Sequence, residues 1–335
     1  MQRSCLALFS GGLDSILACK VLQEQGIDVK AIKFITPFFS HELKDEKKAR
    51  RYKEKVKQRY GIDLEVVDIT PEYLSMVGKP PHGYGRYLNP CIDCKILMIQ
   101  KALSLLDTFN ASFIATGEVL GQRPMSQRRD TLRVIERDSG AEGILLRPLS
   151  ARFLRETLPE KAGIVDRKRL PEITGRSRKK QIRLARDFGI EDYPAPAGGC
   201  VLADPILSKR FKKIFSKWRD YGPEDCILAQ VGRHFLLPAG GWLVVGRNKA
   251  ENEVLSGLVG PDDLVLRATE CPGPFCILRR SRNVSDIRLA AQICVRYAKT
   301  SGFPVTVGMY SDDVTREKIV VEAVPDDKQI HSFMF

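Results

Sequence analysis

The stretch Phe9-Ser10-Gly11-Gly12-Leu13-Asp14-Ser15 decides how the first half of this chain is interpreted. An apolar run at residues 5–9 precedes it and predicts a buried strand, and apolar residues at helical spacing follow it. The stretch therefore lies on a strand-to-helix turn, where free backbone N–H groups and the helix dipole attract anions. Two glycines let the backbone curl around phosphate oxygens, and two serines add hydroxyl donors. Asp14 indicates a bound Mg²⁺ or a role at the helix N-terminus.

This turn, which we call the 10–15 loop, matches neither common phosphate-binding motif. No Gly-Lys-Ser/Thr follows it, which excludes a Walker loop, and its spacing is not G-x-G-x-x-G. The string Ser-Gly-Gly-Leu-Asp-Ser instead resembles the pyrophosphate loop of ATP pyrophosphatases, which adenylate a carbonyl oxygen and release pyrophosphate. The resemblance implies that ATP and Mg²⁺ bind here, through Ser10, Gly11, Gly12, Asp14 and Ser15, and that Asp14 is also catalytic.

Length, composition and cysteine count limit the class of protein. The 335 residues, 43% apolar and 28% charged, are enough for two domains of a soluble globular protein. No apolar run has the length of a membrane span, and the first strand begins too close to Met1 for a signal peptide. We therefore expect a cytoplasmic protein without a membrane partner. The odd number of cysteines, nine, argues against a disulfide framework.

Strands and helices are expected to alternate over residues 1–150. Strands are predicted at residues 5–9, 29–35, 64–67 and 113–116, and helices at 42–59 and 91–106. This alternation predicts an α/β domain with a doubly wound parallel sheet. Because ligands bind beyond the carboxyl ends of such strands, the 10–15 loop, Phe34 at the end of the second strand, and Thr116 with Gly117 should border one crevice.

The second half of the chain has a different character. Residues 151–206 indicate a basic helical connector that carries Cys200, and residues 207–335 a smaller α+β domain. The strands expected in that domain are at residues 227–231, 233–237, 242–245, 264–268, 275–278 and 318–323, with a helix at 285–299.

The net charge of +13 is concentrated in two runs without acids. The first contains Arg176, Arg178, Lys179, Lys180, Arg183 and Arg186, and the second contains six cations at residues 209–219. Such stripes attract polyanions, of which nucleic acid is the commonest in cytoplasm. A solvated helix face is the alternative for any single run. We therefore predict RNA contacts for the cations of residues 176–183.

Cys91, Cys94 and Cys200 are the cysteines with a candidate chemical role. Cys91 and Cys94 stand at the start of a predicted helix, where both sulfurs reach one point and the helix N-terminus lowers thiol pKa values. A redox pair, half of a zinc site and two ligands of an iron–sulfur cluster remain open, as does a purely structural role. Cys200 ends the turn Pro196-Ala197-Gly198-Gly199-Cys200, and three thiolates would leave one cluster iron open.

Other strings resemble enzymes that place sulfur in tRNA. Thr116-Gly117-Glu118-Val119-Leu120-Gly121-Gln122, with Ser126-Gln127 and Arg147-Pro148-Leu149, resembles tRNA 4-thiouridine synthases, which implies that Thr116, Gly117 and Gln122 border the adenylation site. Arg123-Pro124-Met125 departs from that family's small-residue run, and neither its RNA-capture domain nor a rhodanese-like domain is expected. The C-x-x-C with a remote cysteine is similar to iron–sulfur-dependent tRNA thiolases, which implies that the three cysteines ligate a 4Fe–4S cluster.

The C-terminal region resembles an NFACT-type RNA-binding domain. The similarity lies in Gly232-Arg233-His234-Phe235 and Val245-Gly246-Arg247-Asn248-Lys249, and it covers residues 207–335. It implies that Arg233, Arg247 and Lys249 contact RNA, with ordinary surface charge as the alternative.

Together these resemblances predict an ATP-dependent tRNA sulfurtransferase that forms AMP and pyrophosphate. It would adenylate a uridine carbonyl oxygen, with C4 favoured and C2 as the alternative, and replace it with sulfur. The sulfur donor would be sulfide or a cysteine desulfurase, acting through the cluster or through a cysteine persulfide. A pyrophosphate-loop amidotransferase or ligase without RNA, and a non-enzymatic RNA-binding adaptor, are the rival hypotheses. The modified position and the oligomeric state stay open, a homodimer being one alternative.

Overall fold

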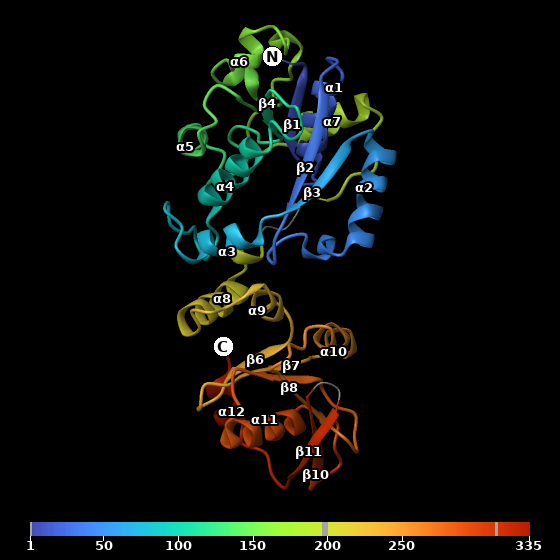
Figure 1. The fold of residues 1–335 in the computed structure, drawn as a ribbon, viewed down its shortest axis with the longest axis vertical. Coiled ribbons are helices and arrows are strands. Elements are labelled where there is room, and N and C mark those ends of the chain that lie inside the picture. The colour runs from blue at the N-terminus through green and yellow to red at the C-terminus, as the bar shows by residue number, and fades with distance from the viewer. Residues whose placement is uncertain (1, 196–199, 312–313) are drawn as a thin grey trace. The chain divides into compact units, whose positions relative to one another are not determined.

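The chain folds into two compact units (Figure 1). A computed structural model describes residues 2–195, 200–311 and 314–335. The first unit is Met1–Asp204 and the second is Pro205–Phe335. The first unit thus includes nearly all of the segment that the sequence analysis assigned to a basic connector.

The first unit alternates strands and helices, and its four predicted strands form within one residue of their expected bounds. Its strands are β1 (Ser4–Leu8), β2 (Asp28–Ile35), β3 (Asp63–Asp68), β4 (Phe113–Thr116) and β5 (Leu145–Leu146). Its α-helices are α1 (Leu13–Gln23), α2 (Glu46–Tyr60), α3 (Thr70–Gly78), α4 (Cys91–Ser104), α5 (Arg129–Ser139), α6 (Leu158–Lys161) and α7 (Lys179–Asp187). Short 3-10 turns are η1 (His41–Lys44), η2 (Ala151–Phe153), η3 (Arg167–Arg169) and η4 (Val201–Ala203).

The five strands form a parallel sheet in the order β3-β2-β1-β4-β5, which confirms the doubly wound α/β fold. At its centre, Ala7 of β1 lies opposite Ala31 of β2 and Ala115 of β4. The strand order reverses between β1 and β4, since β2 and β3 lie on one side of β1 and β4 and β5 on the other. In open parallel sheets such a switch point marks the ligand crevice at the carboxyl ends of the strands.

Helices cover both faces of this sheet (Figure 1). Alternate residues of β1, Cys5 and Ala7, share a buried cluster with Leu17 of α1. Leu6 is also fully buried but belongs to the opposite face, where α4 packs against β1 and β4. Helix α7 packs beside α1, and its Ala185 joins the same cluster as Leu17. This burial on both sides explains the continuous apolar character of the strands.

The second unit is the smaller α+β domain that the sequence predicts. Its elements are α8 (Pro205–Lys217), α9 (Pro223–Leu228), β6 (Arg233–Leu236), β7 (Trp242–Val245), α10 (Lys249–Ser256), β8 (Leu264–Ala268), β9 (Cys276–Arg279), α11 (Val284–Arg296), β10 (Val305–Ser311), β11 (Val314–Val321) and α12 (Asp327–Phe333). The antiparallel sheet has the order β11-β10-β8-β9-β7-β6. Ala290 and Ile293 of α11 pack on one face against Leu243 and Leu266.

The strand predicted at residues 227–231 is wrong. Helix α9 occupies the start of this segment, and Pro223 stands in its first turn. The Asp225 carboxylate accepts a hydrogen bond from the Gly222 N–H at 3.1 Å, which caps the helix. Strand β10 was not predicted from the sequence.

Candidate functional site

The 10–15 loop joins β1 to α1 at the switch point of the first sheet. Gly11 adopts a φ of +86°, and a Cβ placed there would lie 2.7 Å from the Tyr52 hydroxyl. The Ser15 hydroxyl donates to the Gly12 carbonyl at 2.8 Å, and the Ser10 Oγ accepts from the Gly12 N–H at 3.3 Å. Both the backbone conformation and the close approach of Tyr52 therefore require glycine at position 11.

Asp14 is the charged residue of this loop, and its two carboxylate oxygens have different surroundings. Its Oδ2 accepts a hydrogen bond from the Gln122 side chain at 2.7 Å, and the Gln122 Oε1 accepts from Gln181 at 3.1 Å. Its Oδ1 is buried without a hydrogen-bond partner among the described residues. A buried carboxylate oxygen without a donor is costly unless a cation or a ligand satisfies it. This oxygen fits a role in binding Mg²⁺ at the loop.

Lys33 of β2 was missed by the sequence analysis. Its side chain is buried, at 8% exposure, and its ammonium donates to the Ser10 carbonyl at 2.9 Å. Burial lowers the pKa of this ammonium, against the attraction of Glu42. A lysine within the apolar half of the strand, between Ile32 and Phe34, is the signal that could have identified it. Phe34 is also buried, and strand alternation directs it to the opposite face of the sheet from Lys33.

The loop after β4 closes against the 10–15 loop. A Cβ at Gly117 would lie 2.6 Å from the Asp14 carbonyl carbon, so only glycine fits there. The Thr116 hydroxyl donates to Glu118 at 3.2 Å, and Arg147 donates to the same carboxylate at 3.0 Å. Burial by itself would raise the pKa of Glu118, but Arg147 holds it below its usual value. The buried ion pair thereby fixes the segment that carries Gln122.

The three candidate cysteines gather around Tyr73 of α3. Cys94 stands in the first turn of α4 and lies near Tyr73. Burial raises the pKa of Tyr73 well above its usual value, and Cys94, Cys200 and Cys91 raise it further. The Leu88 N–H donates to the Leu202 carbonyl at 3.1 Å and so ties the segment after Cys200 to the one before Cys91.

Burial raises the pKa of Cys94 to about 11, so the expected lowering by the helix N-terminus is wrong for this thiol. Residues 196–199 of the predicted turn before Cys200 lie outside the described residues. Within the part of the chain that is described, no group of three or more His, Cys, Asp or Glu side chains is arranged to hold a metal ion. Thiols are the ligand type that iron–sulfur clusters use, so the chemistry of Cys91, Cys94 and Cys200 suits a cluster although their arrangement does not form a metal site.

His82 anchors the segment between α3 and α4, and the sequence analysis did not identify it. Its Nδ1 lies 2.7 Å from the Asp93 carboxylate, and its Nε2 lies 3.0 Å from the Asp138 carboxylate. The Asp93 carboxylate also accepts from the His82 backbone N–H at 3.0 Å. Since Asp93 lies between Cys91 and Cys94, this contact holds the segment against the cysteine helix.

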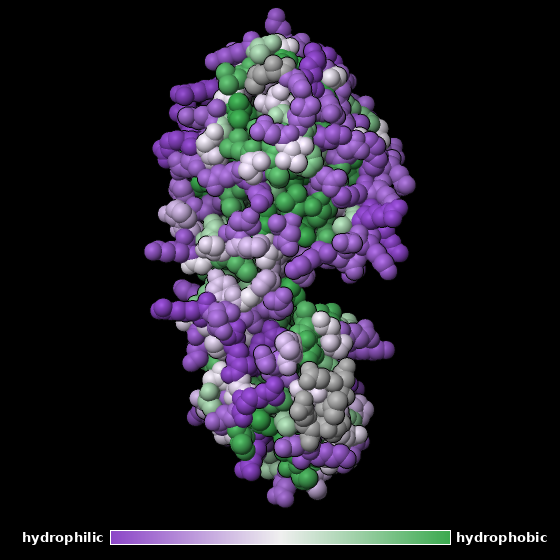
Figure 2. All heavy atoms as spheres, viewed as in Figure 1, coloured by the Kyte–Doolittle hydropathy of each residue, from purple (hydrophilic) through white to green (hydrophobic). Residues whose placement is uncertain are grey.

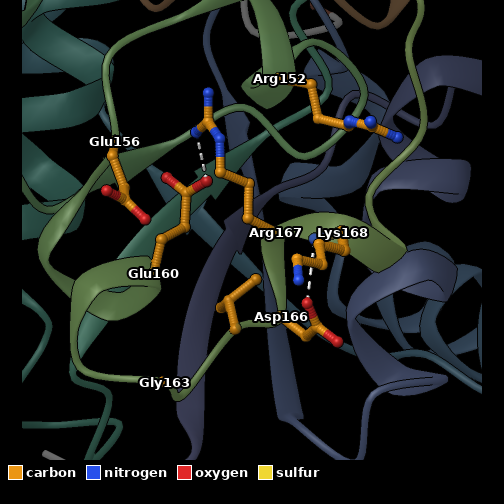
Figure 3. Close-up of a pocket in the computed structure, with 8 residues that line it drawn as sticks. Arg152, Glu156, Glu160, Gly163, Asp166, Arg167 and Lys168 are labelled. Atoms are coloured by element: carbon orange, nitrogen blue, oxygen red, sulfur yellow. Dashed lines mark hydrogen bonds and ion pairs between the residues drawn. The ribbon is translucent and has the colours of Figure 1, made fainter.

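A cavity of about 540 Å³ is lined by residues of η2, α6 and η3 and of the segments between them (Figure 3). Among its lining residues, Arg167 donates to Glu160 at 2.6 Å, and the Asp166 carboxylate accepts from the Lys168 backbone N–H at 2.9 Å. None of the residues predicted to bind ATP, metal or RNA lines this cavity. We therefore assign the candidate site to the 10–15 loop and the cysteines.

The predicted RNA-binding cations differ in their pairing. In the first unit, none of the five cations Arg176, Arg178, Lys179, Lys180 and Arg183 forms an ion pair with a described residue, and all but Arg178 are well exposed. In the second unit, Arg247 pairs with Glu251, Lys249 lies 4.0 Å from Glu253, and Arg233 lies over the Tyr297 ring. The face drawn in Figure 2 is rich in hydrophilic side chains. The run around α7 is thus the better candidate for phosphate contacts.

These features define an α/β unit with a parallel sheet and a glycine loop at its switch point, followed by a separate α+β unit. Comparison with known families agrees: residues 1–152 match the model described as "Thiamine biosynthesis protein (ThiI)", and residues 232–334 match the "NFACT protein RNA binding domain". The chain therefore resembles the pyrophosphate-loop tRNA sulfurtransferases in its first half and NFACT-type domains in its second, as the sequence analysis predicts.

Two curated relatives align with part of the chain. A probable tRNA sulfurtransferase of Thermococcus kodakarensis is 26% identical over 51% of this chain and 44% of its own length. The tRNA-specific 2-thiouridylase MnmA 3 of Phocaeicola vulgatus is 29% identical over 41% of this chain and 38% of its own length. This chain thus spans less than half the length of each.

Among solved structures, the U34-tRNA thiolase NcsA of Methanococcus maripaludis, solved with its [4Fe-4S] cluster, aligns at 15% identity. The alignment covers 68% of this chain and 71% of that one, with a TM-score of 0.33. Among the described residues, no helix has the length and apolar character needed to cross a membrane.

Proposed function

We propose that this chain is an ATP-dependent tRNA sulfurtransferase. The observation that carries the proposal is Asp14, whose one carboxylate oxygen is held by Gln122 while the other is buried without a partner, on a glycine loop at the switch point of a parallel sheet. Free N–H groups at the start of α1 suit phosphate, and the free oxygen of Asp14 suits Mg²⁺. The match of residues 1–152 to the ThiI family supports the same assignment.

The reaction proceeds in two displacements. The uridine carbonyl oxygen attacks the α-phosphate of ATP, and pyrophosphate leaves. A sulfur nucleophile then attacks the uracil ring carbon that bears this oxygen. AMP leaves and takes the oxygen with it. In the first displacement the 10–15 loop and the Lys33 ammonium would stabilise the charge that develops on the phosphates.

Cys91, Cys94 and Cys200 are the residues that would bring sulfur to the activated base. They would hold a 4Fe–4S cluster, which when bound supplies an iron site for sulfide. The hydrogen bond from Leu88 to Leu202, which joins the segment before Cys91 to the one after Cys200, supports this role, and a persulfide on one of the thiols is the alternative. The ThiI match favours 4-thiouridine as the product, while the 2-thiouridylase relative keeps 2-thiouridine as the alternative.

The cations of residues 176–183 and the second unit would hold tRNA. The exposed cations near α7 form no ion pairs with described residues and therefore suit phosphate contacts. Such contacts fix the position of the RNA but do not select its sequence. The Gln122–Gln181 hydrogen bond connects α7 to Asp14, so RNA held on this helix would lie beside the nucleotide loop.

Mass spectrometry of tRNA nucleosides tests the proposal. Cells that lack the gene should lose one thiouridine, and the wild-type gene should restore it whereas the Asp14→Ala gene should not. Chromatography against 2-thiouridine and 4-thiouridine standards identifies which ring carbon of the uridine carries the sulfur. An unchanged nucleoside profile in the deletion strain would reject the function and favour a ligase without RNA or an RNA-binding adaptor.

A further inference from the structure

Exposed apolar and basic side chains gather on two loops beside Cys91. Tyr84, Tyr87 and Met125 are 40%, 37% and 38% exposed, and the exposed Arg86 and Arg123 lie within two residues of them in sequence. We call these five side chains the loop patch. Single exposed apolar residues need no explanation, but a cluster of them indicates an interaction site.

Contacts between the two loops bring the patch to the cysteine. A Cβ at Gly85 would lie 2.7 Å from the Met125 sulfur, so the two loops meet there. The Asn89 amide nitrogen lies 3.2 Å from the Cys91 sulfur and 3.7 Å from the Met125 sulfur. One amide group therefore contacts both the thiol and the thioether, which places the patch at the edge of the cysteine site.

The first of these loops is held in place from several sides. The Tyr84 hydroxyl donates to the Val77 carbonyl at 2.7 Å, and His82 is bound by the Asp93 carboxylate. Since these contacts use the tyrosine hydroxyl and not the ring face, the aromatic surface stays available. A fixed platform loses little entropy when a ligand binds to it.

The charge around the patch favours RNA over an apolar protein segment. Residues 79–90 and 119–129, which form the two loops, contain five cations and no acid. The Arg86 guanidinium lies 5.5 Å from the centroid of the Tyr87 ring. Aromatic rings combined with arginine are the usual means by which proteins hold unstacked bases of RNA.

We propose that the loop patch holds the nucleotide that is to be thiolated. Its base packs against Tyr87 and Met125, and the flanking phosphates lie near Arg86 and Arg123. An enzyme that reacts with a ring atom must take the base out of the stack, and this platform receives it beside Cys91. The inference rests on the proposed function and adds the place where the pyrimidine binds.

Single-turnover thiolation of a tRNA transcript, with tRNA saturating, tests the platform. Tyr87→Ala and Met125→Ala should each slow thiolation by about five-fold to a hundred-fold, the range for loss of one base-stacking contact. Tyr87→Phe keeps the ring and should recover most of the loss. Leu158→Ala removes a side chain of similar exposure (47%) on α6 and should have no effect. Wild-type rates in both alanine variants, or a Phe variant as slow as Tyr87→Ala, would overturn the proposal.

Ultraviolet crosslinking of the full chain to unmodified tRNA gives a test that does not need turnover. Mass spectrometry should find uridine attached to peptides that contain Tyr87 or Met125, also in the Asp14→Ala variant. Crosslinks confined to α7, α8 or the second unit would overturn the inference. If the wild-type protein thiolates no RNA, the proposed function fails, and the crosslink still decides whether RNA occupies the patch. Circular dichroism and thermal unfolding, which need neither ATP turnover nor RNA, confirm that each variant is folded.

Discussion

The Asp14 carboxylate accepts a 2.7 Å hydrogen bond from the side-chain amide of Gln122, which lies 108 residues further along the chain. Gln122 in turn accepts from Gln181, a fully buried residue of α7. Three side chains thus join the 10–15 loop, the segment after β4 and helix α7. The arrangement holds one oxygen of Asp14 in place and leaves the other for a ligand.

Asp14→Ala should abolish the conversion of ATP to AMP and leave the affinity for tRNA within a few fold, because the proposed role of Asp14 is to bind the Mg²⁺ of the nucleotide and not RNA. Asp14→Asn keeps an acceptor for Gln122 but loses the charge, and it should be equally inactive. Gln122→Leu removes one hydrogen bond to a charged group, worth about 1.5–3 kcal/mol, so roughly a ten-fold to hundred-fold loss of rate is expected. Conversion of radiolabelled ATP to AMP measures the rate of each of the three variants. Pyrophosphate release by Asp14→Asn at the wild-type rate would remove Asp14 from the mechanism.

Lys33→Met should weaken ATP binding by about ten-fold or more without lowering the thermal stability. The reason is that a buried ammonium costs solvation energy, and the apolar methionine avoids this cost. Isothermal titration with a non-hydrolysable ATP analogue and thermal unfolding provide the two measurements. Lys20→Met is the matched control, since Lys20 also donates to a backbone carbonyl, that of Tyr60, but on α1 away from the loop. Equal ATP affinity in the two variants would exclude Lys33 from the site.

The sequence was sufficient to predict the first sheet, because an apolar strand, a glycine turn and an apolar helix are signals within about twenty residues. The sequence was insufficient to predict contacts between side chains that are distant in the chain. Nothing local to Tyr73 or His82 indicates that they meet the cysteine helix. The strand prediction for residues 227–231 was wrong for another reason: a short apolar run fits a buried strand or a buried helix equally well. Pro223 and the capping Asp225 are the signals in the sequence that indicate the helix α9.

Replacement of Arg178, Lys179 and Lys180 by alanine should weaken tRNA binding and make it less dependent on salt. Each lost phosphate contact removes somewhat less than one released counterion, so the slope of log affinity against log salt should fall by about two to three. Filter binding at several salt concentrations measures it. The control is Lys47, Lys48 and Lys55, three exposed lysines of α2 whose replacement changes the net charge equally. Identical slopes for the two triple variants would mean that the α7 cations act only through net charge.

The His82 contacts predict that the loop patch loosens as the pH rises. Hydrogen bonding to Asp93 raises the pKa of His82, and Asp138 adds to the effect. Arg137 and then His82 lower the pKa of Asp138, so that carboxylate stays ionised at neutral pH. A raised folded-state pKa stabilises the protein fully below the unfolded value of about 6.5, and this contribution is lost as the pH rises through the folded-state pKa.

Hydrogen exchange of residues 79–90, corrected for intrinsic rates, measures this loosening between pH 6 and pH 9. Protection should fall with pH in the wild-type protein. In His82→Gln, which can hydrogen-bond but does not titrate, it should be lower at pH 6 and independent of pH. Parallel pH profiles in the two proteins would show that the charge of His82 does not hold the loop.

The cluster is the part of the proposal that most needs direct measurement, because its three ligands come from two distant segments. Protein purified without oxygen should be brown and contain close to four irons per chain, and each of Cys91→Ala, Cys94→Ala and Cys200→Ala should lose iron and thiolation but keep ATP binding. Cys226→Ala is the control, since Cys226 is buried in the second unit. Burial disfavours a free thiolate at Cys94, so an unloaded site should alkylate slowly there, whereas a persulfide enzyme needs a reactive thiolate. If iron-free protein thiolates tRNA with a persulfide donor, the cluster mechanism is rejected in favour of the persulfide mechanism.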